Sequence, residues 1–184
     1  MKVGNLKKMK TKGFTLVELL IVIIVIGILL SISIVAYNGA QQRARDSVRQ
    51  NDISEIAKGL EQYYLVNHKY PASGGATVTT NTWNTTADAS WGTFVTTLKP
   101  YMDNNVPSDP ISTPNVNIMT PNGYNYAYFS NSSPTMTCGV GTNQMYILVY
   151  RLEGSSQVTT NSGNCPTTIP TFSGQISAYR MTRI

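Results

Sequence analysis

The chain changes in steps from basic to apolar and then to mixed residues, and these steps predict its first elements. Residues 1–13 hold five lysines and no acid. Residues 14–36 are apolar apart from Gly27 and four polar positions, namely Thr15, Glu18, Ser31 and Ser33. A helix of about 23 residues is about 34 Å long at 1.5 Å per residue, which is enough to cross a bilayer. The pattern therefore predicts a membrane helix behind a basic leader that stays in the cytoplasm.

The helix is expected to continue past the membrane segment, because apolar residues recur on one face of residues 37–70. They fall at spacings of three and four, which is the helical period: Ile53, Ile56, Ala57, Leu60 and Tyr64. No proline occurs before Pro71, which disfavours helix at Tyr70. We expect one continuous helix from Phe14 to about Asn67, roughly 80 Å long. Its apolar stripe needs a cover, and residues 71–184 are the candidate.

Residues 71–184 are expected to form one small globular head. Residues 72–90 have the composition of a loop, and residues 91–102 predict a short second helix that ends before Pro107. Strands are predicted at 124–129, 145–152 and 176–181, with a turn-rich connection at 153–164. These strands favour an antiparallel meander with one face on the helix stripe. The predicted fold class is α+β, a long N-terminal helix packed on a small antiparallel sheet.

Charge and cysteine content narrow the function classes. The chain has 14 basic and 9 acidic residues, and without the five leader lysines the two signs balance. The basic excess therefore belongs to the leader and does not indicate nucleic-acid binding. Cys138 and Cys165 predict one disulfide in an exported head, the alternative being two reduced cysteines.

No pattern of catalysis is visible. His68 is the one histidine and has no nucleophile arrangement around it, so a surface or helix-end role is expected. No phosphate loop, dinucleotide motif or metal-ligand cluster occurs, so we expect neither an enzyme nor a cofactor. Asp103 and Asp109 leave a calcium site open as an alternative.

Three arginines follow the membrane segment: Arg43, Arg45 and Arg49. They are expected to form a solvated helix face or salt bridges with Asp46 and Asp52. DNA binding is the less favoured interpretation.

The residues around the leader's end resemble the type IV pilin family, which includes the pseudopilins of type II secretion. The matching residues run from Lys12 through Gly13, Phe14, Thr15 and Glu18 to Leu19. The resemblance implies that a prepilin peptidase cuts between Gly13 and Phe14 and then N-methylates Phe14. In lipid the Glu18 carboxylate needs a partner, which is the new Phe14 amine of its own chain or that of a neighbouring subunit. The resemblance implies that the pair between subunits sets the register during assembly. The alternative is an ordinary signal peptide, which is cut after its apolar region. It is less favoured, because the apolar run here continues into an amphipathic helix without such a cleavage site.

The same resemblance implies the function. The chain is expected to be a structural subunit of a type IV pilus or related filament: residues 1–13 a cleaved leader, 14–36 the filament core, 37–70 the helix under the head and 71–184 the head. The expected partners are identical or related subunits, the prepilin peptidase, an assembly ATPase and a membrane platform protein. The precursor is expected in the cytoplasmic membrane and the filament at the cell surface. A secretion pseudopilin, or a membrane-anchored module that binds sugar or DNA, remains an alternative.

One position departs from many pilins. They carry a proline about a third of the way along this helix, where the helix can melt during assembly. This chain has only Gly27 and Gly39 in that region, each costing about 1 kcal/mol relative to alanine. Melting of the helix in the filament is therefore left open.

Overall fold

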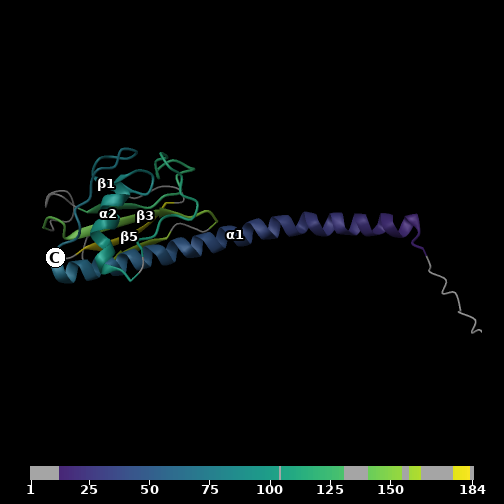
Figure 1. The fold of residues 1–184 in the computed structure, drawn as a ribbon, viewed down its shortest axis with the longest axis horizontal. Coiled ribbons are helices and arrows are strands. Elements are labelled where there is room, and N and C mark those ends of the chain that lie inside the picture. Colours follow the sequence, from purple (N-terminus) through teal and green to yellow (C-terminus); the bar gives the residue numbers. More distant parts are fainter. Residues whose placement is uncertain (1–12, 104, 131–140, 155–157, 163–175, 183–184) are drawn as a thin grey trace, which may run out of the picture. The chain divides into compact units, whose positions relative to one another are not determined.

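The structure is a computed structural model that describes residues 13–103, 105–130, 141–154, 158–162 and 176–182 (Figure 1). Its helices are α1 (Leu16–Asn67), α2 (Ser90–Leu98) and the 3-10 turn η1 (Lys99–Tyr101). Its strands are β1 (Trp83–Thr85), β2 (Ala127–Ser130), β3 (Met145–Arg151), β4 (Thr159–Ser162) and β5 (Ile176–Thr182). The chain falls into two compact units, residues 1–40 and residues 41–184.

Helix α1 is continuous from Leu16 to Asn67, so the predicted single helix is confirmed and its C-terminal end was placed correctly. The helix ends where His68 adopts the left-handed conformation, with a φ of 54°. The next segment is then fixed to the head, because the Tyr70 N–H donates to the carbonyl oxygen of Asn143 at 2.8 Å. A helix-end role for His68 is therefore confirmed.

The sheet has the strand order β1-β2-β3-β5-β4. The pairs β1–β2, β2–β3 and β3–β5 are antiparallel, as the meander predicts, whereas β4 runs parallel to β5. The three predicted strands are present. Strands β1 and β4 correct the predictions of a loop at 72–90 and of turns at 153–164, and β4 makes one edge of the sheet parallel. The α+β fold class is confirmed.

The core of the head lies on both faces of β3, whose seven residues are all buried. Side chains alternate along a strand, so Tyr146, Leu148 and Tyr150 share one cluster, which includes the apolar stripe of α1. Ile147 and Val149 belong to a second cluster on the opposite face. Figure 1 shows the C-terminal half of α1 running along the sheet, so the stripe is covered by the head as predicted.

Candidate functional site

The segment from Gly13 to Thr15 precedes the helix and has no regular secondary structure. Gly13 is exposed, and the Phe14 side chain is 89% exposed. The peptide bond that is predicted to be cleaved therefore lies outside the helix, in a part of the chain that no described side chain covers. Exposed backbone outside regular structure is accessible to a peptidase.

Thr15 and Glu18 form a capping box at the start of α1. The Thr15 N–H and its hydroxyl both donate to Oε2 of Glu18, each at 2.8 Å. In return the Glu18 N–H donates to Oγ1 of Thr15 at 3.2 Å. The reciprocal bonds satisfy N–H groups that have no partner inside a helix. The first helical bond follows directly, from the Leu19 N–H to the Thr15 carbonyl.

The helix behind this cap presents an apolar surface without a cover. The large apolar side chains from Leu16 to Ile34 are 47–80% exposed. Among the described residues, α1 is the helix that is long and apolar enough to span a membrane, by length and composition. Its hydroxyls are satisfied within the helix, because Ser31 donates to the Gly27 carbonyl and Ser33 to that of Leu29, both at 2.8 Å. This surface is suited to lipid or to other apolar helices and not to water.

The structure brings the predicted residues Gly13, Phe14 and Glu18 together within the first turn of α1 and the segment before it. In the uncut chain Phe14 has no free amine, and the Glu18 carboxylate binds Thr15 instead. Pairing of Glu18 with an amine therefore stays a prediction. The cap was not predicted from the sequence, although Thr-x-x-Glu is its usual signature. Cys138 and Cys165 lie outside the described residues, so their disulfide also stays a prediction.

A second group of charged side chains connects α1 to the segments of the head that contain Asp109 and Glu153. Arg49, which is fully buried, donates from Nε and Nη2 to the two carboxylate oxygens of Asp109 at 2.7 and 3.1 Å. Its Nη1 donates to Asp46 at 2.9 Å and to Glu153 at 2.7 Å. Arg45 binds both oxygens of Glu153 at 2.7 and 2.6 Å. We call these five residues the Arg49 cluster.

The Arg49 cluster corrects part of the expectation for the arginines. Arg49 does pair with Asp46, but it is buried rather than on a solvated face. Asp52 does not pair with an arginine among the described residues and accepts the Tyr126 hydroxyl at 2.7 Å. Asp109 is held by Arg49 and by the Ile111 N–H at 2.9 Å, which leaves its oxygens engaged and the calcium alternative without support there. The described residues contain no group of three or more potential metal ligands.

The pKa values of three charged side chains are shifted by hydrogen bonds or by burial. Hydrogen bonds from Arg45, followed by those from Arg49, lower the pKa of Glu153. Burial raises the pKa of Asp52, although the Tyr126 hydroxyl acts in the opposite direction. Burial also lowers the pKa of Arg151, whose Nη2 donates to the Ile118 carbonyl at 2.7 Å.

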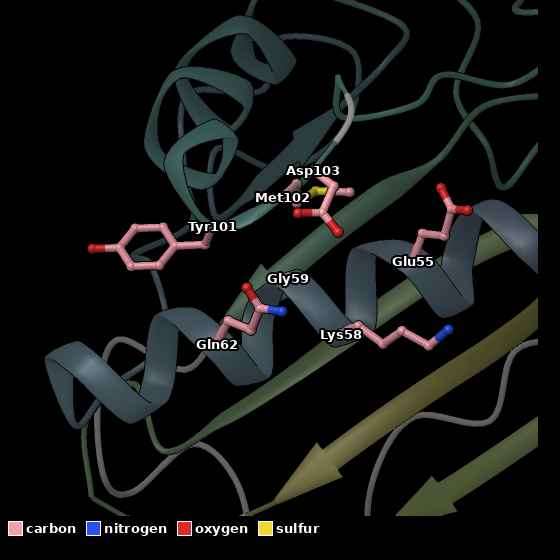
Figure 2. A pocket seen from close by; sticks show the side chains of 7 residues that line it. All are labelled: Glu55, Lys58, Gly59, Gln62, Tyr101, Met102 and Asp103. Carbon is pink, nitrogen blue, oxygen red and sulfur yellow. The ribbon is translucent and has the colours of Figure 1, made fainter.

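A cleft of about 180 Å³ lies between α1 and residues 101–103 (Figure 2). Glu55, Lys58 and Asp103 supply its charges. Gly59 forms its floor beneath Met102, and a Cβ at Gly59 would lie 2.6 Å from Cγ of Met102. The glycine thus lets the segment approach the helix closely. With two carboxylates beside a lysine, the cleft does not have the composition of a cation site.

Comparison with known proteins identifies two regions. Residues 8–34 match the model of the prokaryotic N-terminal methylation motif. Residues 36–146 match the model of the type II secretion system protein G family, which is more than half of the chain. No solved structure matches the chain significantly.

Individual relatives come from both secretion systems and pili. The type II secretion system core protein G of Escherichia coli is 36% identical over 64 residues, which are 35% of this chain and 44% of the relative. That of Vibrio cholerae is 35% identical over 69 residues, or 37% of this chain and 47% of the relative. The Type IV wide pilus major component PilA4 of Thermus thermophilus is 32% identical over 90 residues, or 49% and 69%. The chain thus spans less than half the length of these secretion relatives.

Proposed function

The chain belongs to the type II secretion system protein G family, and from this membership we propose that it is a structural subunit of a type IV pilus or related filament. The observation that carries the proposal is the apolar surface of α1, which is 47–80% exposed from Leu16 to Ile34. This surface has no place in water and is buried either in lipid or against the same helix of other subunits. The apolar surface of α1 is therefore shielded from water both in the membrane and in the filament.

The proposed processing uses the segment before the helix. A prepilin peptidase cuts the Gly13–Phe14 bond, which lies outside α1, and then N-methylates the new amine of Phe14. The match to the N-terminal methylation motif over residues 8–34 supports this step. Removal of the basic leader leaves a chain of balanced charge with a single positive terminus beside Glu18.

The proposed assembly uses Glu18. Its carboxylate is costly in lipid unless it is paired, and the Phe14 amine of an incoming subunit supplies the pair. Identical or related subunits are the partners in the filament. An assembly ATPase and a membrane platform protein would extract the subunit from the cytoplasmic membrane, where it waits as a single-pass protein, and the filament would extend from the cell surface. The family is one of structural subunits, and we propose no catalytic role.

A secretion pseudopilus is the second candidate, because the family model and most of the relatives are those of type II secretion. The relative from Thermus thermophilus, whose name is that of a pilus component, has the longest alignment of those described above and favours the pilus. The arginines give little support to a monomeric DNA-binding module, because Arg49 is buried and Arg45 is paired.

Electron microscopy of sheared surface fibres, with mass spectrometry of their subunit, tests the proposal. We expect fibres built from a chain that begins with methylated Phe14. Gly13→Leu should leave a membrane-bound precursor about 13 residues longer, and Glu18→Ala should insert and be cleaved normally but form few fibres. Fibres at wild-type density from Glu18→Ala would contradict the pairing. Fibres that never leave the envelope would favour the pseudopilus.

A further inference from the structure

Thr15 forms three hydrogen bonds with Glu18 that the proposed function does not use. Both donors of Thr15, the backbone N–H and the hydroxyl, bind the same carboxylate oxygen, Oε2, at 2.8 Å. No described residue donates to the other oxygen, Oε1. One oxygen of the carboxylate, Oε2, is therefore hydrogen-bonded, and these bonds also fix the position of the other oxygen, Oε1.

We propose that Thr15 is a positioning residue for assembly, which holds Glu18 so that Oε1 is ready for the Phe14 amine of an incoming subunit. This inference rests on the proposed function, since it needs a filament and a cleaved Phe14. It adds a residue to the pairing and gives each carboxylate oxygen a separate partner.

The physical reason is pre-organisation. A glutamate side chain has several rotatable bonds, and fixing them when a partner arrives opposes binding. The capping box fixes them beforehand, within the subunit's own first turn. Charge-assisted hydrogen bonds are stronger than neutral ones, so the bonds to Oε2 also reduce the cost of the carboxylate in lipid while the subunit waits.

Residue Phe14 lies before the helix and is 89% exposed, so no described residue encloses it. The nearest backbone donor of the first turn of α1, the Thr15 N–H, already occupies Oε2. The remaining oxygen, Oε1, is the one that the proposal assigns to the Phe14 amine of a second copy of the chain.

Thr15→Val is the test, because valine keeps the shape of threonine and removes the hydroxyl. Thr15→Ser is the matched control, since it keeps the hydroxyl. Each variant is co-expressed with the wild-type chain, and mass spectrometry measures the ratio of variant to wild type in the membrane and in sheared fibres. We expect Thr15→Val to be depleted in fibres by about five-fold relative to the membrane. That change corresponds to ~1 kcal/mol at 1.4 kcal/mol per tenfold, the usual size of a lost helix cap. Thr15→Ser should be incorporated like the wild type.

A second background separates positioning from a general effect on the helix. In Glu18→Ala chains the substitution Thr15→Val should reduce incorporation no further, because Thr15 acts through Glu18. Equal depletion in both backgrounds, or normal incorporation of Thr15→Val, would overturn the inference while leaving the proposed function intact. If the wild-type chain alone forms no fibres, the proposed function fails, and the inference fails with it.

Discussion

Arg49→Met should be among the most damaging single changes in the head. The substitution keeps an unbranched side chain on α1 but removes the cation that binds Asp46, Asp109 and Glu153. Arg45 is then the only cation left in the cluster, and its own bonds are to Glu153. Asp109, whose side chain is fully buried, loses both of its arginine bonds.

The expected size follows from this loss. A buried ion pair that loses one partner costs about 3–5 kcal/mol, because the remaining charge stays desolvated. Domains are stable by only about 5–15 kcal/mol, so the loss removes a large part of the stability of the head. At about 2–4 °C for each kcal/mol in a domain of this size, the melting temperature should fall by roughly 10 °C.

Thermal unfolding of the detergent-solubilised chain, followed by near-ultraviolet circular dichroism, measures this change. The signal reports the tyrosines and tryptophans, and all of these except Tyr37 belong to residues 41–184. Arg43→Met is the control, because Arg43 is exposed and forms no ion pair within the described residues. It should alter stability by no more than about 0.5 kcal/mol.

A double variant makes the prediction stricter. Asp109→Asn in the Arg49→Met chain removes the stranded charge and keeps an acceptor for the Ile111 N–H. The double variant should therefore be more stable than Arg49→Met alone, although Asp109→Asn by itself is destabilising. A loss below about 1 kcal/mol in Arg49→Met, or a double variant no more stable than the single one, would refute the reasoning from buried charge.

Three further predictions concern the head. Gly123→Ala should destabilise the head severely, because a Cβ at this position would lie 2.1 Å from the backbone oxygen of Asn117. Gly92→Ala should instead stabilise α2 by about 1 kcal/mol, because a Cβ there would meet nothing within 4 Å. Urea unfolding of both variants measures these changes. Burial raises the pKa of Tyr128 and of Tyr146 above about 10, the value in the unfolded chain. The contribution of the two protonated tyrosines to the free energy of unfolding is therefore complete below about pH 10 and is lost progressively as the pH rises above it. A near-ultraviolet spectrum unchanged at pH 12 would contradict this. Cys138→Ser should cost about 2–4 kcal/mol if the predicted disulfide exists, and alkylation of both cysteines in the native protein would show that it does not.

The elements that sequence analysis predicted are those with a strong local signal. The end of α1 followed from the helical spacing of Ile53, Ile56 and Leu60 and from Pro71. Strand β3 followed from its apolar run. Strands β1 and β4, by contrast, are three and four residues long and mostly polar, and their pairing with β2 and β5 determines them. The paired residues lie 46 positions apart for Trp83 and Phe129 and 19 positions apart for Thr159 and Ala178. Pairing at such separations leaves no pattern within the strand itself.

The candidate site divides in the same way. Thr15 and Glu18 are three residues apart, so their cap was readable from the sequence. Arg49 lies four residues before Ile53, and that spacing places it on the apolar stripe, which predicts burial. Its partners Asp109 and Glu153 are 60 and 104 residues away, so sequence spacing gave no sign of them.

Because the capping box lies in residues 1–40 and the Arg49 cluster in residues 41–184, α1 carries two separable roles. Changes to Thr15 or Glu18 should alter incorporation into fibres without altering the unfolding of the head. Changes to Arg49 should alter the unfolding and should affect fibres only through the amount of folded subunit. Independent sites have additive effects, so Thr15→Val combined with Arg49→Met should unfold like Arg49→Met alone. Its incorporation per folded subunit should equal that of Thr15→Val. A large departure from additivity in either measurement would mean that the state of the head is coupled along α1 to its N-terminal turn.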